Sequence, residues 1–161
     1  MSNDTTMESK ISSNETVINV LKDLTQLDID AVFAYEQALE NIHDQTIYND
    51  IESFRKDHLR HIDDLSEMIR NYGGTPPERT RDFKGFIIEG FTALRSATGT
   101  RGALSAMETN EKTTNKNYKN ALEENPNLPT DVIALLQKNY GDEQRHLSYI
   151  QVTLQKLDSA E

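Results

Sequence analysis

The chain has 161 residues, a formal net charge of −10 and no cysteine. Its length favours one domain with a buried core, and its 17 Lys and Arg residues are scattered, which argues against nucleic acid or an anionic membrane as a partner. The lack of cysteine excludes disulfides, thiol nucleophiles and thiolate metal sites, so any metal site must be built from His, Asp and Glu.

The N-terminal segment MSNDTTMESKI has neither the basic start nor the apolar core of a signal peptide. No apolar run approaches the length of a bilayer-spanning helix. We therefore expect a soluble, cytoplasmic protein in which residues 1–11 form a disordered tail and residues 12–158 form one folded domain.

Helical periodicity dominates the first half of that domain. Ser12 and Glu15 match a capping box, and the apolar repeat that follows predicts a first helix to about His43. Asp44 opens a short turn, and a second helix then continues to the Gly73–Gly74 pair. The inward positions are Val17, Leu21, Leu24, Asp28, Ala31, Tyr35, Ala38 and Ile42 in the first helix and Ile47, Ile51, Phe54, His58, His61, Leu65, Met68 and Tyr72 in the second.

The second half repeats this organisation. A third helix ends at the sequence ENPNLPT, whose prolines force a loop, and Thr130 can cap a fourth helix. Because the links within each helix pair are short, each pair should be an antiparallel hairpin, and no segment shows the alternation of a strand. The inward positions are Leu104, Met107, Glu111, Thr114, Tyr118 and Ala121 in the third helix and Val132, Leu135, Asn139, Glu143, His146, Ile150, Thr153 and Leu157 in the fourth.

A long link, about residues 73–100, separates the two hairpins. It contains the amphipathic sequence DFKGFIIEGFTALRSA, with apolar residues at Phe83, Phe86, Ile87, Phe91 and Leu94. This short extra helix either covers one end of the bundle or contacts a second copy in a homodimer. The predicted fold is an all-α four-helix bundle of two repeated helical hairpins joined by a long crossover.

The two halves are related by an internal repeat. DIDAVFAYEQAL at residues 28–39 and EKTTNKNYKNAL at residues 111–122 both read acid, six residues, Tyr, two residues, Ala, Leu. The sequences KDHLRHIDDL and GDEQRHLSYI then repeat an Asp, an Arg and a His in the same order. Four matched features in the same order predict a duplicated helical hairpin.

Six ionisable residues interrupt the apolar registers, namely Asp28, His58, His61, Glu111, Glu143 and His146. A buried charge must be paired, protonated or bound to something, because burying it alone costs several kcal/mol or more. The hairpin turns lie near residues 45 and 127, so all six side chains should meet at about the middle of the bundle. Imidazoles and carboxylates that face one point suit a divalent transition metal.

Other polar residues have supporting roles in this interpretation. Asp57 and Asp142 lie beside the inward face, where each can orient a ligand histidine, and Arg60 and Arg145 can pair with nearby acids. The hydroxyls of Tyr35 and Tyr118 should reach the cluster, Glu36 and Glu108 are reserve ligands, and His43 caps the first helix.

These positions resemble those of the ferritin-like superfamily, especially its rubrerythrin-like branch and the small bundles of unknown function related to it. In that family the first and third helices carry an acid followed seven residues later by Tyr, and another helix carries Glu-x-x-His. The matching pairs here are Asp28 with Tyr35, Glu111 with Tyr118, and Glu143 with His146. The resemblance spans about residues 15–157.

Two departures accompany the resemblance: His58 stands where the family has Glu, and Asp28 replaces a longer Glu. The resemblance implies one or two iron ions and redox chemistry on peroxide, dioxygen or Fe(II), with electrons from an external donor. The departures leave a single ion, a zinc site or an asymmetric two-metal site as alternatives, and manganese is a further candidate ion. A different class of function also stays open, which is a non-enzymatic bundle, stress-related or partner-binding, with a relic polar core or a structural zinc site.

Overall fold

The computed structural model describes residues 2–80, 94 and 96–161. Four α-helices account for most of them: α1 (Ser2–Leu39), α2 (Gln45–Asn71), α4 (Gly99–Glu124) and α5 (Thr130–Ser159). No strand occurs in the described residues. The predicted all-α four-helix bundle is confirmed.

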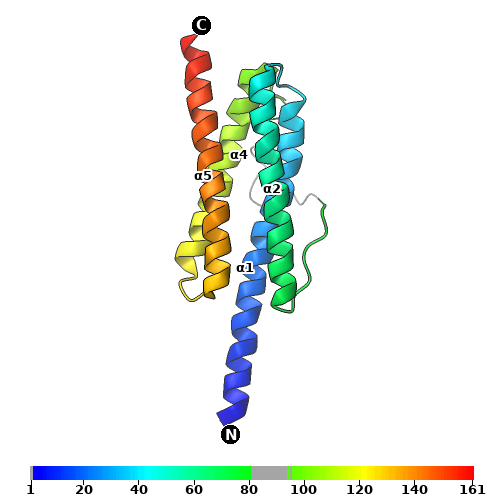
Figure 1. Cartoon of the computed structure of the whole chain (residues 1–161), viewed down its shortest axis with the longest axis vertical. Helices are drawn as coiled ribbons and strands as arrows, with labels where there is room; N and C mark the ends of the chain where they lie inside the picture. The colour runs from blue at the N-terminus through cyan, green and yellow to red at the C-terminus, as the bar shows by residue number, and fades with distance from the viewer. Residues whose placement is uncertain (1, 81–93, 95) are drawn as a thin grey trace.

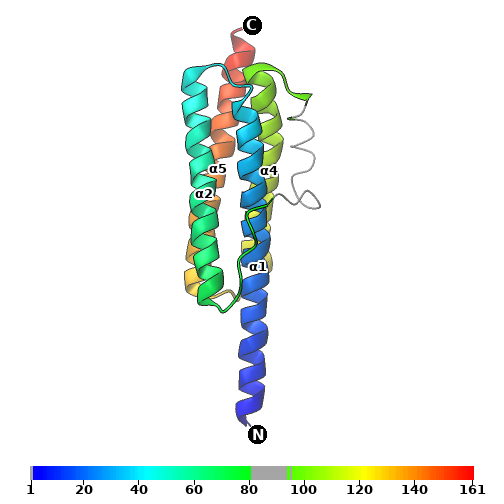
Figure 2. The same ribbon diagram turned by 90° about the vertical axis from the view of Figure 1, so that its right-hand side faces the viewer.

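The helices form two antiparallel hairpins, α1–α2 and α4–α5, with α1 and α5 running in one direction and α2 and α4 in the other (Figure 1). The α1 helix packs against α2 and α4, and α5 packs against α4 and α2. The link from α2 to α4 joins opposite ends of the bundle (Figure 2). Its first part is fixed to α1, because the side-chain amide of Gln26 donates a hydrogen bond to the carbonyl of Thr80 at 2.9 Å.

Local sequence determines where α2 begins and ends. Asp44 caps the helix, since its Oδ1 accepts a hydrogen bond from the backbone N–H of Ile47 at 2.9 Å. At the other end Gly73 adopts a φ of +87°, a conformation that glycine reaches without steric cost. A Cβ at Gly74 would lie 2.8 Å from Ile18 on α1, so this position also permits close packing between the two helices.

Several predicted details differ from the structure. The α1 helix begins at Ser2 and not at Ser12, so it runs through the segment expected as a disordered tail and extends past the bundle (Figures 1 and 2). Residues 4–11 are exposed, and Val17 is the first residue of α1 that the structure describes as buried, so residues 4–11 carry no pattern of packed apolar side chains. Thr130 is the first residue of α5, whose N-cap is Pro129. The predicted apolar residues at 83, 86, 87 and 91 lie outside the described residues, whereas Leu94 is buried in the core.

The buried apolar residues form two main clusters, one toward each end of the bundle. One cluster includes Phe54, Leu104 and Ile150, and the other includes Leu21 and Leu136. Along every helix the buried ionisable residues fall between these clusters, so a polar layer crosses the middle of the bundle. Among the described residues, no helix has the length and apolar character needed to cross a membrane.

Candidate metal site

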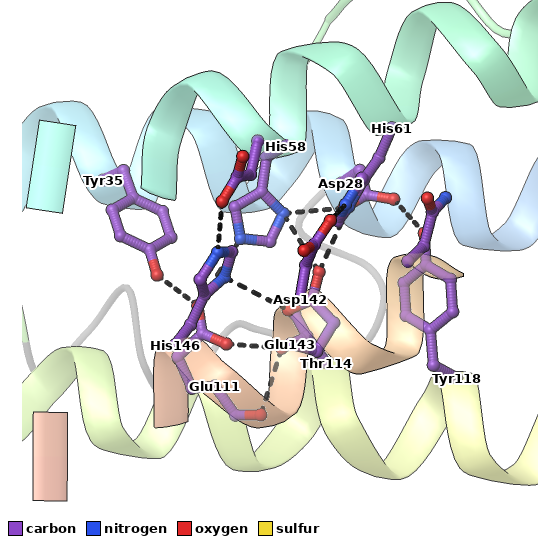
Figure 3. Close-up of polar contacts among 12 residues, drawn as sticks. Asp28, Tyr35, His58, His61, Glu111, Thr114, Tyr118, Asp142, Glu143 and His146 are labelled. Carbon is purple, nitrogen blue, oxygen red and sulfur yellow. Dashed lines mark hydrogen bonds and ion pairs between the residues drawn. The ribbon is translucent and has the colours of Figure 1, made fainter. Parts of the chain in front are cut away.

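The structure brings all six predicted residues together in this polar layer, and each side chain is fully buried (Figure 3). They form two overlapping sets, in each of which the ligand atoms lie within 4.8 Å of one another. We name these sets after the acid that is unique to each. The Asp28 group consists of Asp28, His58, His61 and Glu143, and the Glu111 group consists of His58, Glu111, Glu143 and His146.

The Asp28 group is held together by close polar contacts. Nδ1 of His58 lies 2.6 Å from Oδ1 of Asp28, a short hydrogen bond between α2 and α1. Nδ1 of His61 lies 3.3 Å from the same Asp28 oxygen and 3.3 Å from Oε1 of Glu143. Asp28 therefore already has two imidazole partners, whereas His61 only lies near Glu143.

The contacts within the Glu111 group are longer. Nε2 of His58 lies 3.4 Å from Oε1 of Glu111, and Nδ1 of His146 lies 3.9 Å from that oxygen and 4.0 Å from Oε2 of Glu143. Four buried atoms here have no hydrogen-bond partner among the described residues: Nε2 of His58, both carboxylate oxygens of Glu143, and Nδ1 of His146. Buried polar atoms without a partner are uncommon in folded proteins, so these four need an explanation.

Two outer carboxylates hold two of the histidines from behind. Oδ2 of Asp142 lies 3.0 Å from Nε2 of His61, and Oδ2 of Asp57 lies 2.8 Å from Nε2 of His146. Each contact crosses between α2 and α5. Because Nε2–H donates to the outer carboxylate, Nδ1 of each ring is directed to the centre of the site, the arrangement that orients many metal-binding histidines.

The outer carboxylates are joined by two guanidiniums, as the sequence predicted. Arg60 lies 2.9 Å from Asp57 and 2.5 Å from Asp142. Arg145 lies 2.7 Å from Asp57 and 3.3 Å from Asp142. Burial opposes ionisation of Asp57, but His146 and Arg145 outweigh it and lower the pKa of Asp57, while His61 lowers the pKa of Asp142 to about 2. Both outer aspartates are therefore carboxylates at neutral pH.

The two buried tyrosines contact the acids crosswise. Tyr118 on α4 donates its hydroxyl to Oδ2 of Asp28 at 2.5 Å, and Tyr35 on α1 donates to Oε1 of Glu111. Thr114 donates to the other oxygen of Glu111 at 3.2 Å. Asp28 and Tyr35 belong to one repeat motif, and Glu111 and Tyr118 belong to the other. The tyrosine of each motif thus binds the acid of the other motif.

These contacts follow the internal repeat, so that almost every interaction made by one hairpin is matched by the other. The equivalent pairs are Asp28 and Glu111, Tyr35 and Tyr118, Asp57 and Asp142, Arg60 and Arg145, and His61 and His146. One exception is Thr114, whose equivalent Ala31 has no hydroxyl. The other lies at the centre, where His58 is the equivalent of Glu143. These two residues are also the ones that both groups share.

A comparison with protein families finds one that matches residues 16–124, described as "Domain of unknown function (DUF2383)". The chain belongs to the DUF2383 family. This is a helical family of the ferritin-like type, in agreement with the bundle. No curated protein matches the chain. In this DUF2383 member, four of the six clustered residues lie in the matched segment, and Glu143 and His146 on α5 lie beyond it.

The carboxylates of the DUF2383 site ionise unequally. Burial opposes ionisation of Asp28, but His61 and His58 outweigh it and hold the pKa of Asp28 well below its usual range. Glu111 also has a lowered pKa, because His58 outweighs the effect of burial. In Glu143, burial and the neighbouring Glu111 raise the pKa to about 7. Glu143 is thus the acid whose charge is least compensated by the protein itself.

The three imidazoles divide in the same way. Burial opposes the charged form of His58 and His61, but neighbouring carboxylates outweigh it and raise both pKa values. Glu143 and Asp28 act on His58, and Asp28 acts on His61. Burial lowers the pKa of His146, so that ring is neutral and its Nδ1 carries a lone pair. Two imidazoliums therefore supply the positive charge that the carboxylates need when no cation is bound.

The two reserve ligands and His43 lie away from the cluster. Glu36 is half exposed and pairs with Arg55, and Glu108 pairs with Lys112, so neither joins the two groups. His43 lies four residues beyond the end of α1 at Leu39, and its backbone N–H donates to Thr100. The prediction that the first helix runs to about His43, which caps it, is therefore wrong.

The donor set fits a divalent transition metal chemically. Such ions bind imidazole nitrogen and carboxylate oxygen at about 2.0–2.2 Å, so two ligands of one ion lie up to about 4 Å apart. The atoms of each group are already near that spacing. A bound cation would also take up the lone pairs of the four unpartnered atoms. These buried groups are thus able to hold a metal ion.

Proposed function

We propose that this DUF2383 protein binds one or two iron-type ions in the buried cluster and uses them in redox chemistry on peroxide, dioxygen or Fe(II). The observation that carries the proposal is the set of four buried ligand atoms without a partner, on His58, Glu143 and His146. Each such atom costs about 1–3 kcal/mol when it stays unpaired, and a metal ion would satisfy all four. All six residues of the cluster are proposed as ligands.

The ligand types support iron over a hard cation. Calcium and magnesium prefer oxygen ligands, whereas three imidazoles in one cluster favour iron, zinc, copper or nickel, and carboxylates extend the range to manganese. Among these, iron agrees with the resemblance of Asp28–Tyr35, Glu111–Tyr118 and Glu143-x-x-His146 to the rubrerythrin-like branch. We assign the chain to that branch as part of the proposal.

Iron would supply one-electron redox chemistry, and the chain's own residues would hold and shield it. Asp57 and Asp142 would keep Nδ1 of His146 and His61 aimed at the metal. The apolar clusters on both sides would exclude bulk water from the site. Because these 161 residues contain no cysteine, we propose that the electrons come from a donor outside them. The expected setting is the cytoplasm.

One observation favours the second candidate, a relic bundle without metal. The 2.6 Å hydrogen bond between His58 and Asp28, with the tyrosine hydroxyls on Asp28 and Glu111, satisfies much of the cluster without an ion. Such a bundle would act by binding a partner and would take up no metal. A structural zinc site would instead hold zinc and show no redox turnover.

Elemental analysis of untagged protein, purified without chelators, tests the proposal, followed by anaerobic titration with Fe(II). The decisive variant is H58A/E143A, which removes the two residues shared by both groups. H43A/E108A is the matched control, because it makes the same two changes outside the groups. We expect iron to bind to the wild type and the control and not to H58A/E143A.

Each alternative result has a distinct meaning. Stoichiometric iron in H58A/E143A would show that the site assignment is wrong. Zinc without redox turnover would support a structural role, and a wild-type protein that takes up no Fe(II) would support the relic bundle. Turnover of peroxide or dioxygen by the iron-loaded wild type, lost in H58A/E143A, would support the redox part of the proposal.

A further inference from the structure

The two groups have the same composition, two carboxylates and two imidazoles, yet their hydrogen bonding differs. The difference begins at His58, the ring that both groups share. Its Nδ1 faces the Asp28 group and is committed to Asp28 at 2.6 Å. Its Nε2 faces Glu111 at 3.4 Å and has no hydrogen-bond partner in the part of the chain that the structure describes. Metal binding must remove one proton from the His58 imidazolium, and with Nδ1–H still donating to Asp28 the lone pair is left on Nε2, which points into the Glu111 group.

The histidine unique to each group shows the same bias. Nδ1 of His61, in the Asp28 group, lies 3.3 Å from oxygens of both Asp28 and Glu143, so it is engaged as a donor. Nδ1 of His146, in the Glu111 group, has no partner, although its ring is held by Asp57 just as the ring of His61 is held by Asp142. An ion in the Asp28 group must break hydrogen bonds that its own ligands make with one another. In the Glu111 group, Nδ1 of His146 already offers a lone pair, and Nε2 of His58 has only an unpartnered proton to release.

We infer that the Glu111 group binds the first metal ion and that the Asp28 group binds a second ion more weakly. The inference rests on the proposed function. In the one-ion form the ligands are Glu111, Glu143, His146 and Nε2 of His58. Asp28 then acts as a positioning residue, since its hydrogen bond to Nδ1 directs the other nitrogen of His58 at the ion. Despite the duplicated sequence, the two halves of the site are unequal.

Matched variants at equivalent repeat positions test this inference. E111Q and D28N each replace one acid by its amide, and the Asn oxygen of D28N can still accept the hydrogen bond from His58. Anaerobic Fe(II) titration of the wild type should show two steps of unequal affinity. E111Q should weaken the tighter step by about tenfold or more, and D28N should keep that step within about threefold and weaken the second.

A second matched pair protects the test against a variant that folds poorly. H146Q should remove the tighter step and H61Q should keep it, with helical content checked by circular dichroism. The inference would be overturned if E111Q and D28N weakened the tighter step equally, or if D28N and H61Q weakened it more than E111Q and H146Q do. Either result would leave metal binding in place. Absence of Fe(II) binding to the wild type would overturn both the inference and the proposed function.

Discussion

Tyr118 on α4 donates its hydroxyl to Asp28 on α1, and Tyr35 on α1 donates its hydroxyl to Glu111 on α4. Each helix of this pair therefore holds the acid of the other. All four side chains are fully buried. The two hydrogen bonds link the hairpins to each other and orient the two acids that distinguish the proposed metal groups.

Replacing either tyrosine by phenylalanine should destabilise the metal-free protein. Hydrogen bonds to charged groups contribute about 1.5–3 kcal/mol, so Y35F and Y118F should each lower the free energy of unfolding by about that amount. Urea unfolding in the presence of a chelator measures it. Y48F, at a position 36% exposed, is the control and should change stability by less than about 0.5 kcal/mol. If Y35F and Y118F also lost less than about 0.5 kcal/mol in the free energy of unfolding, the two tyrosine hydrogen bonds would not have the stabilising role assigned to them.

Metal binding should raise the stability of the fold, because the site is assembled from all four helices. At a free metal concentration of about 100 times Kd, a ligand that binds the folded state alone stabilises it by about 2.7 kcal/mol. For a domain of this size the corresponding increase in Tm is roughly 5–10 °C. Thermal unfolding with Fe(II) under anaerobic conditions, and again with chelator, tests this. The Tm of H58A/E143A should be the same in the two conditions. If the Tm of the wild type were also unchanged by the metal, that result would count against binding.

The metal-free protein should lose stability in acid through Asp142. His61 lowers the pKa of Asp142 to about 2 from an ordinary value of 3.8, so the carboxylate stabilises the folded state above about pH 4. That contribution disappears as the pH falls from about 4 to about 2. Because Asp142 is partly exposed to solvent, we expect about 1 kcal/mol, less than the full pKa difference implies.

Urea unfolding of the wild type and D142N at pH 7 and pH 3 measures this contribution. The stability difference between the two proteins should be smaller at pH 3 than at pH 7. D63N is the matched control, because the Asp63 side chain is 65% exposed in its pair with Arg79. If the difference in the free energy of unfolding between the wild type and D142N were the same at both pH values, ionised Asp142 would not be the cause of the acid-induced loss of stability.

Removal of residues 1–11 should leave the bundle intact. Residues 4–11 of α1 are exposed, so the deletion should change the free energy of unfolding by less than about 0.5 kcal/mol while helical content falls. Removing residues 1–21 also deletes Val17 and Leu21, which are 2% and 0% exposed, and should cost at least about 2 kcal/mol. Urea unfolding and circular dichroism compare the two truncations. A large loss in the shorter truncation would move the start of the folded domain upstream of Ser12.

Sequence periodicity was sufficient to predict the four helices and the residues of the polar layer. An ionisable residue on an otherwise apolar face, such as His58 or Glu111, stands out because burial of charge is costly. Which partner each residue meets was not predictable. Period defines the face of a helix but not the distance or stagger across a bundle. The sequence therefore predicted that Tyr35 reaches the cluster and that Asp57 orients a histidine, but not that each contacts a residue of the other hairpin.

Two smaller errors have a similar origin. In α5 the buried apolar positions include Leu136 and Leu154, where strict alternation had chosen Leu135 and Leu157. An α-helix has 3.6 residues per turn, so its inward stripe drifts away from a strict alternation of steps of three and four, which averages 3.5. The start of α1 was missed because exposed polar residues carry no packing pattern.

The presence of His58 at the position equivalent to Glu143 also determines how hairpins can pair. The α1–α2 hairpin contributes one carboxylate and two imidazoles to the centre, and the α4–α5 hairpin contributes two carboxylates and one imidazole. Two copies of the first hairpin would bring four imidazoles together, and two copies of the second would bring four carboxylates together. Unlike hairpins balance each other, so the central charges favour assembly within one chain over pairing of like halves from different chains.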